Sequence, residues 1–303
     1  MTSRVLGLFL RSLDDAYQIA QRAECITQAT VHGFSVREVD ARNDSETQVR
    51  QIREAMALPD LVRPRAILVN PVREAALQML ARDAARLGVG WVSLNRTCDY
   101  VRDLRHAYPS LCFFCVDPDQ REIGRMQGRQ FRALLPRGGE VFYIQGPTSA
   151  SSARLRLAGV QSELQDAPVE LSIGNADWSA EGGKQAMREW LAKRVRRSQR
   201  RFLVGAQNDS MAVGARDALL ATRQVAAFVT GCDGLPTYGQ RLVLEGQLTA
   251  TVIVPSTTPR AVNEVIAVLS GGRPPSSDLM LNVESFPDLG TLSTVAKQPA
   301  GSS

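Results

Sequence analysis

The sequence predicts an α/β protein with two doubly wound parallel-sheet lobes. Stretches with the pattern of strands and stretches with the pattern of helices alternate almost throughout the 303 residues, as expected for parallel sheets covered by helices. Two such series follow one another, the second beginning near Asp119, and both have the same order of elements. The repeated order indicates an internal duplication at the level of the fold, although the residues themselves show little similarity.

The first series opens on the apolar strand RVLGLFL, and its helices are recognised by apolar residues at helical spacing. In the first helix, Ile19, Ala23 and Ile26 mark one such face. The expected elements are, in order, a strand at 4–10, a helix at 14–30, a strand at 34–40, a helix from Ser45, a strand at 66–70, a helix at 74–87 and a strand at 89–95.

The second series repeats this alternation and then gives way to a different pattern. Its expected elements are a helix at 123–135, a strand at 140–146, a helix at 153–164, a strand at 169–178, a helix at 180–196, a strand at 202–207, a helix at 210–220 and a strand at 226–233. Two extended segments, 249–255 and 277–286, then flank a helix at 259–269. These segments suit a hinge through which the chain crosses back to the first lobe.

Four of the apolar runs end in an amide or an acid. Asn70 and Asn95 end runs in the first half, and Asn208 and Asp233 end runs in the second. Parallel α/β sheets bind ligands at the carboxyl ends of their strands, so these side chains indicate two half-sites facing one ligand. Amides and carboxylates form paired hydrogen bonds with hydroxyl groups. This arrangement favours a small polyhydroxylated molecule.

Two aromatic residues fit the same interpretation, since the apolar face of a sugar ring packs against aromatic rings. Tyr17 follows the first strand and Trp178 ends a strand of the second half. Each candidate also has a structural alternative: Asn208 as a helix N-cap, Asp233 as part of a turn, Asn70 as a helix start and Trp178 as a core residue. Their joint placement at strand ends in both halves favours binding.

Charge and hydropathy exclude several classes of protein. The net charge is +5, and the densest basic stretch, KRVRRSQRR at 193–201, reads as a helix end and a solvated loop. No aromatic residue interleaves with it, so it offers no stacking platform for nucleic acid. No apolar run approaches the roughly 18 residues of a membrane span, and the opening VLGLFL is too short for a signal-peptide core.

Cysteines and histidines offer little chemistry. Five cysteines are scattered through the chain, which is not a disulfide framework. Cys112 and Cys115 have the spacing of a metal knuckle, but residues three apart on a strand face opposite sides, so we expect buried structural thiols and no metal or cofactor. We expect His32 in a helix-to-strand connection and His106 in a polar loop, both at the surface. Common catalytic motifs are absent, which makes an enzyme the least favoured class.

Several segments resemble the ribose-type sugar-binding proteins of the type I periplasmic binding protein superfamily, which also supplies the effector domains of lactose-repressor-like regulators. The segments are IQGPTSASSARLRLAGVQSEL (144–164), AQNDSMAVGARDAL (206–219) and VTGCDGLPTYGQRLVLEGQLTATV (229–252). In the first half, SLDDAY, VDARND, AILVNPV and VSLNR agree as well. The resemblance covers nearly the whole chain, and QND-x-MA-x-GA and DG-x-P are its most specific motifs.

The resemblance implies two lobes joined by a three-segment hinge and a shell of ligand-binding residues drawn from both. The implied lobes are 1–117 with 254–283 and 118–253 with 284–295, followed by a flexible tail at 296–303. The implied ligand-binding residues are Arg11, Asp15, Tyr17, Asn70, Asn95, Arg96, Arg154, Trp178, Asn208 and Asp233.

The chain departs from the ribose-type pattern at several of these positions. Arg11 stands where a small polar residue is usual, and Asn95 replaces the usual aspartate before Arg96. Gln18 follows Tyr17 where a second aromatic residue is common, and Val254 occupies the place of a ligand-binding glutamine. The ligand therefore need not be ribose, and both a neutral monosaccharide and an acidic derivative fit the residues.

We therefore expect a solute-binding protein that captures a monosaccharide or polyol by lobe closure and presents it to an ABC transporter permease or a sensor kinase. The expected compartment is the periplasm, with the leader absent from this numbering. The alternative is a cytoplasmic sugar-sensing regulator, or a repressor effector domain without its DNA-binding segment. Because the chain starts on its first strand without a helix-turn-helix, we expect no nucleic-acid binding by this chain alone and no membrane insertion.

Overall fold

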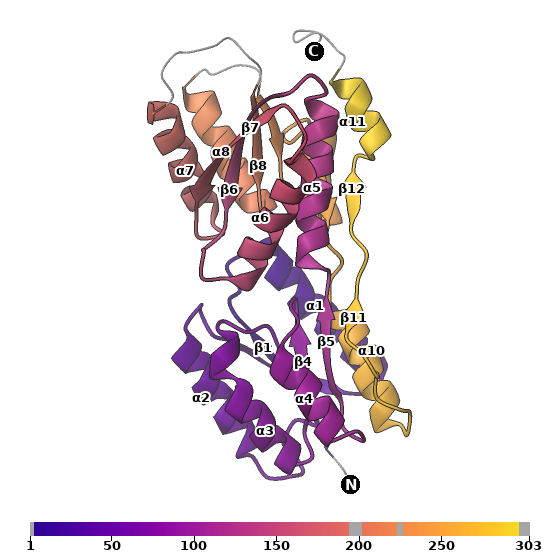
Figure 1. Cartoon of the computed structure of the whole chain (residues 1–303). Helices are drawn as coiled ribbons and strands as arrows, with labels where there is room; N and C mark the ends of the chain where they lie inside the picture. The colour runs from indigo at the N-terminus through magenta and orange to yellow at the C-terminus, as the bar shows by residue number, and fades with distance from the viewer. Residues whose placement is uncertain (1–2, 194–201, 223–226, 297–303) are drawn as a thin grey trace. The chain divides into compact units, whose positions relative to one another are not determined.

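The computed structural model describes residues 3–193, 202–222 and 227–296, and the chain divides into two compact units (Figure 1). Unit 1 comprises Met1–Pro118 and Ser256–Leu281, and unit 2 comprises Asp119–Pro255 and Asn282–Ser303. The chain therefore passes from one unit to the other three times. The crossings predicted from the sequence lie after residues 117, 253 and 283.

Unit 1 is built on a six-stranded parallel sheet with the strand order β11-β5-β4-β3-β1-β2. Its strands are β1 Val5–Leu10, β2 Ser35–Asp40, β3 Ala66–Val69, β4 Gly90–Leu94, β5 Phe113–Asp117 and β11 Leu279–Met280. Its helices are α1 Ala16–Val31, α2 Ser45–Met56, the 3₁₀ turn η1 Glu74–Ala76, α3 Gln78–Arg86, α4 Asp99–Ala107 and α10 Thr258–Leu269.

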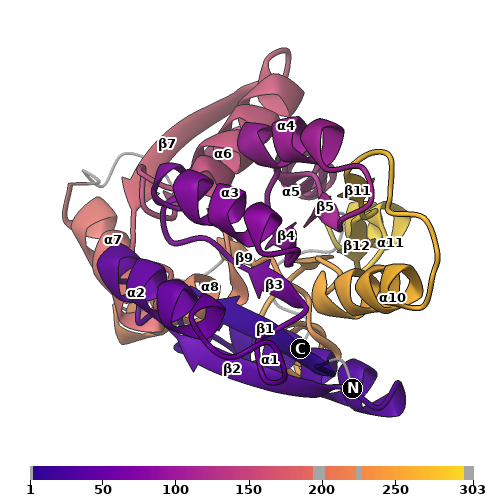
Figure 2. The same ribbon diagram turned by 90° about the horizontal axis from the view of Figure 1, so that it is seen from below.

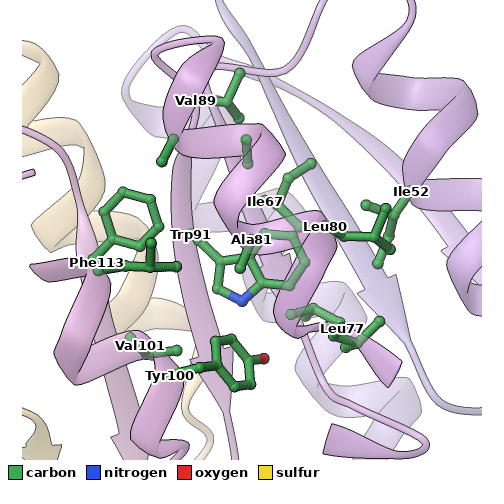
Figure 3. Packing of buried hydrophobic residues seen from close by; sticks show 14 of the residues in the cluster. Ile52, Ile67, Leu77, Leu80, Ala81, Val89, Trp91, Tyr100, Val101 and Phe113 are labelled. Atoms are coloured by element: carbon green, nitrogen blue, oxygen red, sulfur yellow. The ribbon is translucent and has the colours of Figure 1, made fainter. Parts of the chain in front are cut away.

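Helices cover both faces of this sheet, which is why its inner strands β1, β3, β4 and β5 read as nearly continuous apolar runs (Figure 2). Alternate residues of β1 face opposite cores: Phe9 packs with α2, α3 and α4, whereas Leu8 and Leu10 pack with α1 and α10. The fully buried indole of Trp91 lies at the centre of the first of these cores, between the side chains of α3 and Tyr100 of α4 (Figure 3).

Unit 2 has a four-stranded parallel sheet with the order β7-β6-β8-β9 and a two-stranded antiparallel ribbon of β10 and β12. Its strands are β6 Gly139–Gln145, β7 Val169–Asn175, β8 Phe202–Ala206, β9 Ala227–Thr230, β10 Thr251–Ile253 and β12 Glu284–Phe286. Its helices are α5 Gln120–Leu134, α6 Ser151–Leu164, α7 Ala180–Lys193, α8 Asp209–Ala221, the π-helical turn η2 Pro236–Gln240, α9 Arg241–Leu244 and α11 Leu289–Val295. Helices α5, α6 and α11 pack on one face of the sheet, and α7 and α8 pack on the other.

The structure corrects three details of the predicted elements. A helix, α4, occupies Asp99–Ala107, so the prediction of a polar loop around His106 was wrong, although His106 is exposed as expected. The predicted helix at 74–87 is divided into η1 and α3, and the predicted strand at 277–286 is divided into β11 and β12, which belong to different sheets. Charged residues are as numerous as apolar ones in α4, which leaves only a short apolar stripe at Val101 and Leu104 as a signal.

The five cysteines are all free and buried, as predicted. Cys112 and Cys115 pack into the cores on opposite faces of the sheet, as expected for residues three apart on a strand. Among the described residues, no helix is long and apolar enough to cross a membrane. The basic stretch at 194–201 and residues 297–303 of the predicted tail lie outside the described residues.

Candidate functional site

In unit 1, the loop after β1 places a paired arginine and aspartate at the carboxyl end of the sheet. Arg11 Nη2 lies 2.5 Å from Asp15 Oδ2, and Arg11 Nη1 donates to Asn43 Oδ1 at 3.0 Å. Asp15 is also the N-cap of α1, since its Oδ1 accepts a hydrogen bond from the backbone N–H of Gln18 at 2.8 Å. The carboxylate therefore orients both the helix and the guanidinium. Tyr17 lies in the first turn of α1 and is 5% exposed.

Asn70 follows β3 directly, and its side chain is buried. Its Nδ2 donates to Gln18 Oε1 at 3.0 Å, while its Oδ1 has no hydrogen-bond partner among the described residues. Gln48 fixes the backbone on either side, donating to Asn70 O and accepting from Val72 N, each at 2.9 Å. A buried acceptor without a donor costs free energy, and a ligand hydroxyl would remove that cost.

Asn95 and Arg96 follow β4. Asn95 Oδ1 accepts a hydrogen bond from Thr257 Oγ1 at the start of α10, at 2.7 Å. Arg96 is nearly buried, and its Nη1 lies 3.2 Å from Glu74 Oε1. The carboxyl ends of β1, β3 and β4 thus carry the residues predicted for the first half-site: Arg11, Asp15, Tyr17, Asn70, Asn95 and Arg96.

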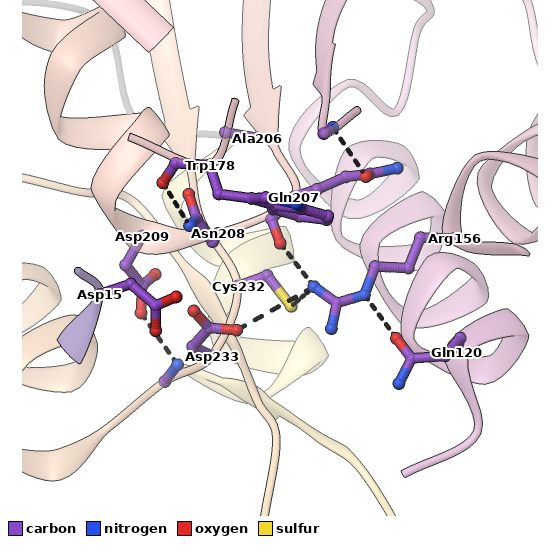
Figure 4. A network of polar contacts seen from close by, with 12 residues as sticks. Asp15, Gln120, Arg156, Trp178, Ala206, Gln207, Asn208, Asp209, Cys232 and Asp233 are labelled. Carbon is purple, nitrogen blue, oxygen red and sulfur yellow. Dashed lines mark hydrogen bonds and ion pairs between the residues drawn. The ribbon is translucent and has the colours of Figure 1, made fainter. Parts of the chain in front are cut away.

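In unit 2, Arg156 is the buried cation at the carboxyl end of the sheet (Figure 4). Its Nη1 donates to Gln207 O at 2.6 Å, and its Nε donates to Gln120 Oε1 at 2.8 Å. Nη1 also lies 4.0 Å from Asp233 Oδ1, and the guanidinium lies 5.9 Å from the ring centroid of Trp178. Gln207 is itself fixed, because it bonds Gly146 N and the carbonyl of α6 residue Ala153.

Arg154, the arginine that the resemblance implied for the ligand shell, lies elsewhere on α6. It is exposed, and its Nη1 donates to the carbonyls of Thr148 and Ser149 at 2.9 and 3.0 Å. The structure brings Arg156, not Arg154, together with Trp178 and Asp233. The candidate second half-site is therefore Arg156, Trp178, Asn208 and Asp233.

Asn208 combines two structural roles with a place in this half-site. Its Oδ1 accepts from Met211 N at 2.8 Å and caps α8, as the N-cap alternative predicted, and its Nδ2 donates to Trp178 O at 2.8 Å. The Trp178 indole lies against Gly146, where a Cβ atom would approach the ring to 2.3 Å. The absence of a side chain at Gly146 therefore lets the indole occupy its place.

Three site residues other than glycine adopt positive φ angles. These are Asn95 at 64°, Trp178 at 75° and Asp233 at 103°. Such backbone conformations are unfavourable for residues with a Cβ atom and are found preferentially at functional sites. Their occurrence in both units marks these strand-end loops as candidates for binding.

Asp209 supports the loop that carries Asp233. It is buried at the start of α8, where its Oδ2 accepts from Gly234 N at 2.9 Å and its Oδ1 accepts from Thr251 Oγ1 at 2.7 Å. Burial raises the pKa of this carboxyl to about 7, although the hydrogen bonds oppose the shift. The carboxyl group therefore titrates within the physiological range.

The raised pKa of Asp209 predicts a pH-dependent stability. The folded-state value lies above the ordinary value of 3.8, so its contribution to stability is fully present below pH 3.8 and is lost as the pH rises through about 7. Between pH 6 and pH 8, this group alone should reduce the free energy of unfolding by about 1.4 kcal/mol. Urea denaturation at both pH values should show the loss in the wild type and not in Asp209→Asn, and equal pH dependence in the two proteins would contradict the assignment.

Gln18, Glu74, Gln120, Arg156 and Gln207 were not predicted as site residues. Gln18 and Glu74 contact the predicted Asn70 and Arg96, and Gln120 and Gln207 hold Arg156. Glu74 and Gln120 are brought to the half-sites by contacts across tens of residues and no local pattern marks them, whereas Gln207 lies in the QND motif. Arg156 does have a local signal, because it lies at helical spacing from Ala153, Val160 and Leu164 and so shares the buried face of α6 with them.

Comparison with known proteins places these features in a family. The chain is 30% identical over 235 residues to a Rhizobium meliloti protein assigned as rhizopine-binding, covering 76% of this chain and 72% of that protein. It is 22% identical over 253 residues to the ribose import binding protein of Escherichia coli K12, covering 83% and 79% respectively. The relatives are binding proteins, and the predicted resemblance to ribose-type proteins is confirmed.

A solved structure agrees with the predicted fold class. The ABC transporter periplasmic solute-binding protein of Actinobacillus succinogenes with bound D-allose superposes with a TM-score of 0.82 and 18% identity, covering 96% of this chain and all of that one (100%). Two doubly wound parallel-sheet lobes are therefore confirmed as the architecture. Residues 6–269 match the family model described as a periplasmic binding protein domain, and the chain belongs to that family.

Proposed function

We propose that this protein is a solute-binding protein that captures a neutral monosaccharide or related polyol and presents it to the permease of an ABC transporter. The observation that carries the proposal is the set of amides, carboxylates and guanidinium groups at the carboxyl ends of parallel strands in both units. These groups offer donors beside acceptors, which is the pattern that a hydroxyl group needs. The names of the relatives and the family membership support the same role.

Paired charges favour a neutral ligand over an acidic one. The three arginines of the half-sites each lie beside a carboxylate of the same unit: Arg11 beside Asp15, Arg96 beside Glu74, and Arg156 beside Asp233 at 4.0 Å. Each guanidinium can donate to a hydroxyl oxygen in a forked geometry while the neighbouring carboxylate accepts a hydrogen bond from the same hydroxyl. The net charge of these pairs is zero, so they leave no excess of positive charge for a ligand carboxylate.

Aromatic rings complete the proposed site. Trp178, held over Gly146 and against Arg156, and Tyr17 at the start of α1 would pack on the apolar face of a sugar ring. Asn70 Oδ1 would accept a hydrogen bond from a ligand hydroxyl, since it is buried without a partner among the described residues.

Binding would couple to closure of the two units. The three crossings, at Pro118–Asp119, Pro255–Ser256 and Leu281–Asn282, form the proposed hinge. A ligand that contacts both half-sites does so only in a closed state, so binding shifts the population towards closure. The permease would recognise that state. The proposed role involves no bond making or breaking, and the relatives favour the periplasm as its compartment.

Isothermal titration calorimetry with pentoses, hexoses, inositols and sugar acids tests the proposal. We expect at least one neutral sugar or polyol to bind with micromolar or tighter affinity and to be recovered unchanged, as judged by mass spectrometry. Absence of binding across the panel would contradict the sugar-binding role, and chemical conversion of a bound sugar would contradict the non-enzymatic one.

A further inference from the structure

Glu74 is a residue of the first half-site for which no ligand role was predicted. It opens the turn η1, which follows Asn70 and β3, and its Oε1 lies 3.2 Å from Arg96 Nη1. The side chain of Arg96 is 10% exposed and that of Glu74 is 33% exposed. The Glu74 carboxylate is therefore close enough to neutralise the nearly buried guanidinium of Arg96, and it is exposed enough for a ligand to contact it.

Position 95 explains why this carboxylate matters. Asn95 precedes Arg96 and carries no charge, and its Oδ1 accepts from Thr257 Oγ1 at 2.7 Å. The residue next to Arg96 in the chain therefore supplies no counter-ion. Glu74 is the carboxylate that forms an ion pair with Arg96, and it reaches this position from a different strand-end loop.

We propose that Glu74 determines the charge specificity of the site by excluding acidic ligands from Arg96. This inference rests on the proposed sugar-binding function. A ligand carboxylate at Arg96 would lie beside the Glu74 carboxylate, and like charges in a nearly buried environment repel strongly. A hydroxyl at the same place meets a donor and an acceptor together, and so binds without repulsion.

The test compares matched pairs of a neutral sugar and its acid, such as D-glucose with D-glucuronate and D-galactose with D-galacturonate. Calorimetry at pH 7.5 and low salt gives the ratio of the two affinities for the wild type and for Glu74→Gln. Glutamine keeps the shape of the side chain and removes its charge. In Glu74→Gln we expect the affinity for the acid, relative to that for the neutral sugar, to rise by about tenfold or more. This increase should become smaller as salt is added.

Glu38→Gln is the matched control. The Glu38 side chain is also 33% exposed and forms an ion pair with an arginine, Arg22. Glu38 lies on β2 and Arg22 on α1, and neither residue belongs to the candidate half-site. We expect the affinity ratio of Glu38→Gln to equal that of the wild type. Asn95→Asp in the Glu74→Gln background restores a carboxylate beside Arg96, and we expect it to restore the preference for the neutral sugar.

The outcomes separate this inference from the proposed function. An unchanged ratio in Glu74→Gln, or an equal change in Glu38→Gln, overturns the role of Glu74 while sugar binding itself stands. A wild type that binds neither the neutral sugars nor the acids, here or in the wider panel, overturns both. Should Glu74→Gln not fold, as judged by circular dichroism, Glu74→Ala replaces it and removes the same charge. The ratio must then move towards the acid as well, and an unchanged ratio overturns the inference.

Discussion

Arg156→Ala is expected to weaken ligand binding by about a hundredfold or more, because removing one partner of a buried, charge-assisted network typically costs a few kcal/mol. Arg156 is 8% exposed and is held by Gln207 O and Gln120 Oε1 beside Asp233. Calorimetry with the sugar identified by the panel measures the loss. Arg156→Lys should lose much of the same affinity, since an ammonium group cannot reproduce the fork of donors.

Arg154→Ala is the matched control for this prediction. Arg154 lies two residues away on the same helix and has the same side chain. That side chain is exposed, and its Nη1 donates to the carbonyls of Thr148 and Ser149 in the loop before α6. We expect the affinity of Arg154→Ala to stay within about twofold of the wild type, as for most surface substitutions. Equal losses in Arg154→Ala and Arg156→Ala would contradict the assignment of Arg156 to the half-site.

Gly159→Val is expected to destabilise unit 2 by about 3 kcal/mol, through overpacking of a helix–helix contact. A Cβ atom at Gly159 would approach Arg121 O to 2.2 Å, and one at Gly124 would approach Arg156 O to 2.0 Å. Helices α5 and α6 therefore meet backbone to backbone, and a larger side chain must force them apart. Because α6 carries Arg156, we expect ligand binding to weaken as well.

Urea denaturation checks the loss of stability, with Ala158→Val as the matched control. Ala158 precedes Gly159 on α6 and is partly exposed, so its substitution introduces the same side chain away from the contact with Gly124. It should cost no more than the modest helix preference of alanine over valine, about half a kcal/mol. A Gly159→Val protein as stable as Ala158→Val would show that the helices tolerate separation.

Much of the fold is predictable because each element of a doubly wound sheet leaves a local pattern. Buried strands such as β3 and β8 read as short apolar runs, and the residues that follow them, Asn70 and Asn208, end near the carboxyl edge of a sheet, as predicted. The helix α4 was missed because its buried stripe is too short to stand out among charges. Local periodicity predicts a helix only where the buried face is long enough to show in the sequence.

The site was less predictable, since its geometry depends on contacts between distant residues. A motif identifies the stretch ARLR but not which arginine turns inward, and only the helical spacing of the apolar residues of α6 favours Arg156. Residues two apart on a helix point in nearly opposite directions, so Arg154 and Arg156 cannot exchange roles. The ion pair of Glu74 with Arg96 joins two loops and has no sequence signature at all. Ligand contacts of the individual residues remain predictions.

The route of the chain constrains how the protein emerges from the ribosome. One core of the first sheet includes Ala261, Val262, Val265 and Ile266, all contributed by α10, and the edge strand β11 lies later still. A nascent chain that has released only the first 118 residues thus exposes apolar side chains of β3 and β4 that α10 covers in the folded protein. Synthesis must proceed through the whole second sheet before the first can be sealed. The apolar face that α10 covers therefore has no cover from α10 until residues 258–269 have been synthesised.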